Sequence, residues 1–409
     1  MSSACREGTS APSVVPPTRR RRLRGLALAV AGLLSVGAVT ASTTGAAVAA
    51  PGSRTATAAT SPDLGPNVLV FDPSMPVATI QAAVDRVAAE QVPNQFGTAR
   101  YALLFKPGTY GTVAKPLVFQ VGYYTEVAGL GASPTDVTIN GHVDVYNQCD
   151  QDGCLALNNF WRSLSNLTIN VAGAADCRSS GNFWAVSQAS PMRRVNITGG
   201  NLTLMDYCTA GPQFASGGFI ADSRTGFVIN GSQQQFLVRD SVIGGWSNGV
   251  WNQVFSGTVG APAQSFPKPD PYTTLASTPV SKEKPYLYVD AAGRWMVRVP
   301  SARTSSSGVT WANGLTPGRS IPLSAFYVAR PGDSAARIGS QLAQGKHLLL
   351  TPGVYDVDHT IKVKRAGTVV LGLGLTTLTA QHGAVAMAVA DVPGVDIAGV
   401  TFDAGAVNS

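Results

Sequence analysis

Charged side chains and histidine are scarce in this chain. Among 409 residues, Asp, Glu, Lys and Arg make up 13%, four residues are His, and 44% of the chain is hydrophobic. A disordered chain or a long coiled coil would carry more charge. Both classes are therefore excluded for most of the length.

Motifs for metals and nucleotides are also missing. The sequence has no P-loop and no H-E-x-x-H pair. Gly372 and Gly374 lack the third glycine and the following helix of a dinucleotide site. The segment 245–249 fits the pattern G-x-S-x-G, but strand-like sequence follows it where a nucleophile elbow needs a helix. We predict no metal and no cofactor.

Most of the positive charge lies in the first fifty residues. The formal net charge is +7, and residues 1–50 hold six Arg and one Glu. The remaining chain has about as many basic as acidic side chains, so it lacks the basic stripe of a nucleic-acid-binding protein. A neutral polysaccharide is the partner that this balance favours.

The N-terminal segment has the pattern of a secretion signal. A run of arginines from Arg19 to Arg24 precedes an apolar stretch from Gly25 to Val39, and small residues at 47–49 offer a cleavage site. The apolar stretch is shorter than the roughly 20 residues of a membrane span, although a retained signal anchor is the alternative. We predict a signal peptide over 1–49, a flexible arm over 50–63, and a secreted, extracellular monomer without a membrane span after cleavage.

The cysteines agree with export. Four of them follow the leader, at Cys149, Cys154, Cys177 and Cys208. Four cysteines allow three pairings, and we prefer Cys149 with Cys154 because these two are close in sequence, which leaves Cys177 with Cys208. A zinc site is the rival interpretation, but no C-x-x-C spacing supports it.

Short β-branched runs separated by Asn, Asp or Gly dominate the rest of the chain. LSNLTIN at 164–170, MRRVNITG at 192–199 and VDIAGVTFDAG at 395–405 share this rhythm. Asn and Gly tolerate the left-handed backbone angles that sharp corners need. The pattern predicts an all-β, right-handed parallel β-helix, in which each coil buries its apolar residues on the next. An antiparallel β-sandwich is the alternative, but two-residue hairpin signals are scarce.

A long internal repeat divides the chain. ALLFKPGTY at 102–110 returns as HLLLTPGVY at 347–355, and TIQAAVD at 79–85, within the clearest predicted helix (80–90), returns loosely at 336–342. We predict a first β-helix domain over 64–261, a linker with a β-hairpin over 262–320, and a second β-helix domain over 321–409. The second copy is shorter and ends without a closing cap, so we expect it to be incomplete.

These motifs resemble those of the pectate-lyase-like β-helix superfamily, and within it the tandem β-helix proteins of the glycoside hydrolase family 55 (exo-β-1,3-glucanase) type. The resemblance rests on FKPGTY at 105–110, NNFWRSLSNLTI at 158–169, WAVSQASPMRRVNI at 184–197 and EKPYLYVD at 283–290. It implies an active cleft between the two helices, with a general acid Glu from the later part of the second. No Glu occurs from Ser320 to Ser409. The resemblance also implies that Gln188 helps to hold the attacking water, although a corner-capping role is the alternative.

The remaining candidates follow from residue type. Inverting hydrolysis needs two carboxyl groups about 6.5–9.5 Å apart. We favour Asp206 and Asp222 over Asp144, Asp176 and Asp240 because aromatic residues lie near them in the sequence, although most Asp residues in such coils cap corners. Flat apolar rings suit sugar binding, and packing inside the solenoid is the alternative that we favour for each ring. The ring candidates are Trp161, Trp184, Trp246, Trp251, Tyr123 and Tyr124.

Taken with the resemblance, the sequence predicts a carbohydrate-active, glycosidase-like protein for a β-glucan or related polysaccharide, inactive if the acid lies outside this chain. A non-catalytic polysaccharide-binding or surface-structural solenoid is the alternative. A polysaccharide lyase is the second choice of enzyme, since Arg193 and Arg194 could act as a base, but no cluster of Asp and Glu for Ca²⁺ accompanies them.

Overall fold

The computed structural model describes residues 61–151, 153–173, 176–231, 234–267 and 271–406. The predicted signal peptide, and the predicted arm up to residue 60, lie outside the described residues. Within the described ranges, no helix is both long enough and apolar enough to cross a membrane.

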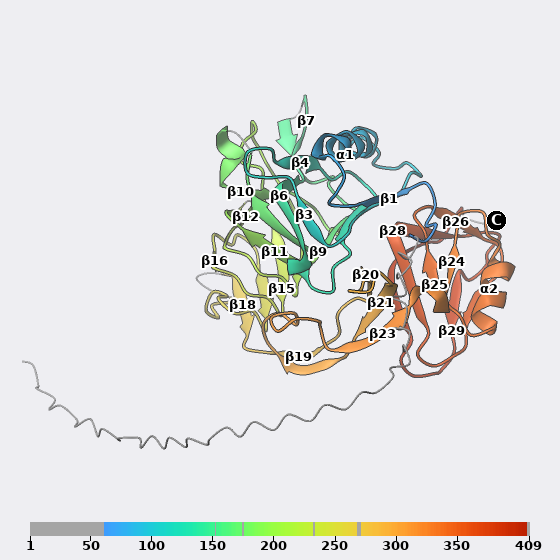
Figure 1. Ribbon diagram of the computed structural model, residues 1–409. Coiled ribbons are helices and arrows are strands. Elements are labelled where there is room, and N and C mark those ends of the chain that lie inside the picture. Colours follow the sequence, from blue (N-terminus) through green and yellow to red (C-terminus); the bar gives the residue numbers. More distant parts are fainter. Residues whose placement is uncertain (1–60, 152, 174–175, 232–233, 268–270, 407–409) are drawn as a thin grey trace, which may run out of the picture. The chain divides into compact units, whose positions relative to one another are not determined.

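The first β-helix is built on one large parallel sheet (Figure 1). Strands from successive coils stack side by side, and their apolar side chains point inward to one continuous core. The path of the sheet is β1 (Val68–Phe71), β2 (Tyr101–Phe105), β5 (Thr125–Gly129), β9 (Arg162–Val171), β11 (Met192–Thr198), β13 (Gly217–Ala221), β15 (Gln235–Arg239), β17 (Gln253–Ser256) and β18 (Tyr272–Leu275), with β3 (Gly108–Tyr110), β4 (Leu117–Gln120) and β6 (Val137–Asp144) joined to it. A second sheet contains β10 (Gly181–Phe183), β12 (Asn201–Thr203), β14 (Phe227–Ile229) and β16 (Gly245–Trp246). The predicted parallel β-helix is confirmed.

Two rows of left-handed corners bound the strands of the large sheet. In both rows the corner residues have φ between +46° and +59°, apart from one glycine at +124°. The first row contains Tyr124, Trp161, Ala189 and Gly217, and the second contains Asn166, Arg194, Asp222, Asp240 and Gly257. Asn, Asp and Gly adopt this conformation readily, whereas bulky residues do so rarely. The corner pattern seen in the sequence therefore accounts for the second row except Arg194, whereas the first row has Asn, Asp or Gly only at Gly217.

Helix α1 (Val77–Gln91) belongs to the first coil and packs on β4. Its buried face carries Ile80, Val84 and Val87, which join the core of the solenoid. The helix predicted at 80–90 is confirmed, and it begins three residues earlier because Pro76 supplies its N-terminal boundary.

The second β-helix repeats the start of the first. It consists of β24 (Phe326–Ala329), α2 (Ala335–Ala343), β25 (His347–Leu350), β26 (Val354–Val357), β27 (Ile361–Val363), β28 (Val369–Ala380), β29 (Met387–Val389) and β30 (Asp396–Asp403), preceded by the 3-10 turn η3 (Leu323–Ala325). The repeated Pro-Gly-x-Tyr turn has the same role twice. The hydroxyl of Tyr110 donates to the carbonyls of Phe71 and Lys106, and that of Tyr355 donates to the carbonyls of Ala329 and Thr351. Each tyrosine thus ties its turn to the end of the first strand.

Antiparallel strands connect the two β-helices. The predicted hairpin is confirmed, because β20 (Tyr286–Val289) pairs with β21 (Trp295–Pro300) and β23 (Gly318–Pro322) adds a third strand. A separate pair, β19 (Thr278–Ser281) and β22 (Arg303–Ser306), lies beside the far coils of the first β-helix.

Two disulfides stabilise the loops beside the second sheet. Cys149 pairs with Cys154 across the short hairpin of β7 (Gln148–Asp150) and β8 (Gly153–Leu155). Cys177 pairs with Cys208 and joins the 3-10 turn η2 (Asp176–Ser180) to the loop after β12; another 3-10 turn, η1 (Pro134–Asp136), precedes β6. The preferred pairing is therefore the one that the structure has.

Candidate functional site

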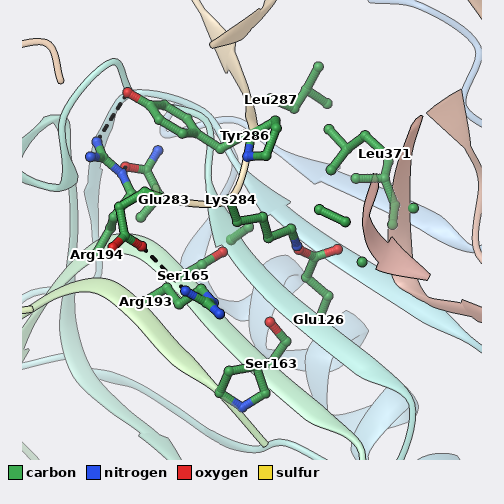
Figure 2. A pocket seen from close by; sticks show the side chains of 18 of the residues that line it. Glu126, Ser163, Ser165, Arg193, Arg194, Glu283, Lys284, Tyr286, Leu287 and Leu371 are labelled. Carbon is green, nitrogen blue, oxygen red and sulfur yellow. Dashed lines mark hydrogen bonds and ion pairs between the residues drawn. The ribbon is translucent and has the colours of Figure 1, made fainter. Parts of the chain in front are cut away.

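A cleft of about 480 Å³ lies between the two β-helices (Figure 2). One wall is the outer face of the large sheet, and the opposite wall comes from β28 and β30 of the second β-helix. The segment Lys282–Leu287 of the connecting region lines it as well. Three separate parts of the chain therefore meet at this cleft.

The strand alternation determines which side chains face the cleft from the first β-helix. Val127, Leu164, Met192, Ile220 and Val238 point into the core and are almost fully buried. Their neighbours must point outward, since successive side chains of a strand alternate between faces. The strand register aligns the outward residues in two rows, Glu126–Ser163–Pro191–Phe219–Leu237 and Ala128–Ser165–Arg193–Ala221–Arg239. Serines thus occupy one end of the wall and arginines with apolar residues the other.

Glu126 joins all three parts of the cleft. Its carboxylate lies 3.1 Å from Nζ of Lys284 in the connecting segment and accepts a 2.8 Å hydrogen bond from the backbone N–H of Gly374 in β28. The residue is only 4% exposed. A buried carboxylate with two such partners stabilises the arrangement of the two β-helices.

Glu283 lies between two arginines of the sheet. Its carboxylate contacts Arg193, at 3.3 Å, and Arg239. Both guanidinium groups also lie over the ring of Phe219, at 4.5 and 5.4 Å from its centroid. Burial lowers the pKa of Arg193 from its usual value, but an arginine still remains charged at neutral pH.

The carboxylates that line the cleft are all ion-paired. Asp396 of β30 contacts Lys282, so each of the three lining carboxylates, Glu126, Glu283 and Asp396, has at least one basic partner. Across the described residues, no group of three His, Cys, Asp or Glu side chains is placed to hold a metal ion. Within the described lining, a carboxylate free to act as an acid or base is therefore lacking.

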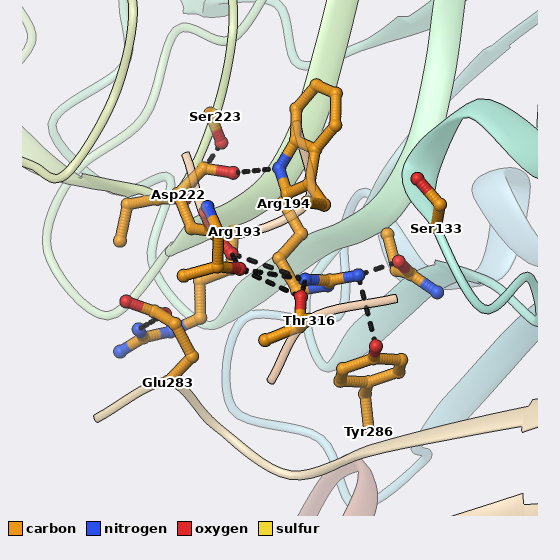
Figure 3. A network of polar contacts seen from close by, with 12 residues as sticks. Ser133, Arg193, Arg194, Asp222, Ser223, Glu283, Tyr286 and Thr316 are labelled. Carbon is orange, nitrogen blue, oxygen red and sulfur yellow. Dashed lines mark hydrogen bonds and ion pairs between the residues drawn. The ribbon is translucent and has the colours of Figure 1, made fainter. Parts of the chain in front are cut away.

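Asp222, a predicted catalytic residue, lies at a left-handed corner and is fully buried (Figure 3). Its carboxylate is 3.3 Å from Nη1 of Arg194 and accepts a 2.6 Å hydrogen bond from the hydroxyl of Thr310, while its backbone carbonyl accepts one from the indole of Trp311. Burial raises the pKa of Asp222 to about 6, and Arg194 opposes that shift. These contacts attach the connecting region to the first β-helix.

Asp206, the other predicted carboxylate, is fully buried in the disulfide-linked loops. It accepts hydrogen bonds from Arg178 at 2.8 Å and from the backbone N–H groups of Asn147 and Cys208, both at 3.2 Å. Asp206 and Asp222 therefore belong to two separate networks, and neither is among the residues that line the cleft. Their catalytic roles remain predictions, with structural contacts that account for both.

Gln188 is exposed at the corner before β11. The hydroxyl of Ser216, at the same corner of the next coil, lies 3.1 Å from its side-chain oxygen. The next residue, Ala189, lines the cleft. Gln188 thus lies beside the cleft with its amide accessible, and its predicted role in holding water remains a prediction.

The ring candidates fall into two groups. Trp184 and Trp246 are 1% and 8% exposed and pack in the hydrophobic core, so neither offers a ring face to a ligand, and packing is their role. Trp251 is 52% exposed at the far end of the sheet, and Trp161 is half-buried and stacks on Tyr124. Of the four candidate tryptophans, Trp161 and Trp251 remain for sugar binding.

Sequence reasoning missed the acidic residues of the cleft, although it named Arg193 and Arg194. It considered only Asp residues of the first β-helix as catalytic carboxylates, whereas Glu126 and Glu283 line the cleft. One signal was available, since Glu126 interrupts an apolar run at a position that strand alternation turns outward. The partners of both glutamates are distant in sequence, and only the fold brings them together.

Comparisons with known proteins agree with this architecture. The model of the LAM55 pectate lyase-like domain matches residues 326–409. An exo-beta-1,3-glucanase from Streptomyces sp. (strain SirexAA-E / ActE) is 49% identical over 402 residues, which cover 98% of this chain and 63% of the relative.

Solved structures give the same result. The structure of sacteLam55A from Streptomyces sp. SirexAA-E has a TM-score of 0.78 and 52% identity over 85% of this chain and 60% of that chain. A variant of the same protein, in complex with glucose, has a TM-score of 0.77 with the same identity and coverage. This chain spans less than two thirds of the length of these relatives.

Proposed function

We propose that this chain, a pectate-lyase-like tandem β-helix protein of the glycoside hydrolase family 55 type, acts on a β-1,3-glucan that binds in the cleft between its β-helices. The observation that carries the proposal is the 49% identity, over almost the whole chain, to an exo-beta-1,3-glucanase. The glucose complex of the variant relative also supports a sugar ligand.

The cleft has the chemistry that a neutral sugar needs. Ser163 and Ser165 present hydroxyl groups on one wall, and Gln188 with Ser216 adds an amide and a hydroxyl beside it. Sugar-binding sites combine such polar groups with apolar surface, which Pro191 and Leu373 supply.

The residues of this chain bind and orient the glucan in the proposed mechanism. Hydrolysis needs a protonated carboxyl at the leaving oxygen and, for inversion, a second group that activates water. The carboxylates of Glu126 and Glu283 are directed at basic partners, which makes them unsuited to proton donation. In this proposal Gln188, which is exposed beside the cleft, holds a water molecule through its amide.

Glucose release from laminarin, a β-1,3-glucan, tests the hydrolytic function. The purified chain is incubated with laminarin and, as a control for linkage, with a soluble β-1,4-glucan, and free glucose is measured. Glucose release from laminarin, without release from the β-1,4-glucan, supports the proposal. The proposal would be overturned if the chain neither released glucose from laminarin nor bound laminarin.

A non-catalytic glucan-binding protein is the second candidate. The ion-pairing of all three lining carboxylates favours it, because none of them is a free acid. Saturable binding of laminarin without glucose release would support this candidate, whereas release would contradict it.

We also propose that the protein acts outside the cell. The two disulfides support this location, since such bonds persist in oxidising compartments. Expression of the full chain in a Gram-positive host, followed by detection in the medium, tests the proposal; protein retained entirely inside the cells would contradict it.

A further inference from the structure

Two bulky aromatic residues occupy a strained corner of the first β-helix. Tyr124 and Trp161 have φ of +50° and +53°, whereas the next coils place Ala189 and Gly217 in the same row. A positive φ in a bulky residue is a genuine outlier that strains the backbone. Since a smaller residue would avoid much of this strain, the arrangement points to a use for the rings.

The rings form a stack along the solenoid axis. The guanidinium of Arg100 lies 3.5 Å from the ring centroid of Tyr124 and therefore covers one face of that ring. Trp161 stacks on the other face, with centroids 5.3 Å apart and planes within 11°. Phe96, which is 81% exposed, meets Trp161 at 64°, as an edge rather than a second stacked layer.

The next position in the stack contains only a methyl group. Ala189 follows Trp161 by 28 residues, the same spacing that pairs Leu164 with Met192 in the neighbouring strands. Successive coils lie about 4.8 Å apart, so an aromatic residue at 189 would continue the stack. Ala189 is exposed and lines the cleft. Trp161 also meets the ring of Phe160, at 46° with centroids 5.4 Å apart, so the space for a further ring is the part of this layer beside Ala189.

Polar groups border this space. The side-chain oxygen of Gln188 accepts a hydrogen bond from Ser216. This leaves the Gln188 amide N–H groups available as donors, since the described residues give them no acceptor. Ser163, one position beyond Arg162, contributes a hydroxyl on the cleft side.

We propose that one pyranose ring of a β-glucan stacks on Trp161 in the space above Ala189, with the Gln188 amide donating to a sugar hydroxyl. This inference rests on the proposed function and adds the location of one sugar subsite. The apolar face of a β-glucopyranose ring carries only axial C–H groups, which suit a flat indole. The glucan therefore enters the cleft at its Trp161 end.

Binding of laminaritriose, measured by isothermal titration calorimetry, tests the subsite with two opposite changes. Trp161→Ala removes the ring and is expected to weaken the affinity about tenfold. Trp161→Phe keeps an aromatic ring and is expected to retain part of the affinity. Ala189→Phe fills the space and is expected to weaken it by a similar factor. Tyr124 and Trp161 show that an aromatic residue can be held in this left-handed conformation, although with the strain described above.

Phe227→Ala is the matched control, because it removes a 44% exposed ring from the other sheet. The affinity of this variant for laminaritriose is expected to stay within twofold of that of the unsubstituted chain. Thermal unfolding identifies any variant that fails to fold. If Trp161→Ala does not fold, the Ala189→Phe variant still tests the subsite. Unchanged affinity in folded Trp161→Ala or Ala189→Phe overturns the subsite and leaves the proposed function intact. No binding by the unsubstituted chain overturns both.

Discussion

Asp222 illustrates how one residue combines a backbone and an electrostatic requirement. Its left-handed φ of +50° suits Asp, Asn or Gly, and its carboxylate fixes Arg194 and Thr310 in the interior. The sequence places an Asp at a corner, which is what the common role of Asp in such coils predicts. Its partner Thr310 is 88 residues away, so no local pattern could reveal the network.

Asp222→Asn should change how stability depends on pH. Burial raises the pKa of Asp222 to about 6 from 3.8, so the folded state binds its proton more tightly than the unfolded state. The carboxyl then contributes most to stability below about pH 4, and this contribution falls as the pH rises to about 6, by on the order of 1–3 kcal/mol.

Asn accepts the same left-handed corner and does not titrate. In urea unfolding, the free energy of unfolding of the unsubstituted chain should therefore decline between pH 4 and pH 7 relative to that of the Asp222→Asn variant. Parallel pH profiles for the two proteins would contradict the buried, protonatable state of Asp222.

At the scale of elements, the strands and their corners were predictable because each coil uses a local code. Apolar residues alternate along short strands, and Asn, Asp or Gly close the turns. Four left-handed corner residues depart from that code, namely Tyr124, Trp161, Ala189 and Arg194. The disulfide-linked loops beside the second sheet are the other departure, because long insertions interrupt the regular coils there.

The two disulfides should contribute unequally to stability. In the chain-entropy account, a longer closed loop gives the larger effect. Cys177 and Cys208 are 31 residues apart, whereas Cys149 and Cys154 are five apart. Replacing both members of the longer pair by Ser should lower the free energy of unfolding by about 4 kcal/mol, and of the shorter pair by about 2 kcal/mol.

Urea unfolding of the two double variants under identical conditions measures this difference. An equal or reversed order would mean that the loops themselves, rather than closure of the unfolded chain, determine the effect. Far-UV circular dichroism serves as the check that each variant retains the β-helix.

At the scale of the whole molecule, contacts between the two β-helices shape the cleft. Glu126 of the first helix binds both the connecting segment and the backbone of the second. Lys282 and Asp396 add an ion pair between the connecting segment and β30. The internal repeat predicted two similar folding units, but not how their surfaces meet, since that depends on residues more than 100 positions apart.

Glu126→Ala should loosen the second β-helix from the first. The change leaves the N–H of Gly374 and the ammonium of Lys284 without their carboxylate, and an unpaired buried partner costs about 2–4 kcal/mol. Hydrogen exchange of the backbone amides in β28 should accelerate, whereas exchange in β13 and β15 should stay unchanged.

Glu126→Gln is the matched control. Its side-chain oxygen still accepts from Gly374 but carries no charge, so exchange in β28 should lie between that of the unsubstituted chain and that of Glu126→Ala. Identical exchange in all three proteins would show that Glu126 does not hold the β-helices together.

Export, the tandem solenoid, the N-terminal helix and the disulfide pairing could all be inferred from the sequence, because each rests on short-range patterns of charge, periodicity and spacing. The described structure confirms the solenoid, the helix and the pairing. The composition of the cleft belongs to the tertiary structure alone. Glu126, Glu283 and Arg239 become neighbours of distant residues only when coils stack and the two β-helices pack together. Strand alternation directs a side chain outward, but only the opposing surface determines whether it pairs with a charge, lines a cleft or meets a ligand.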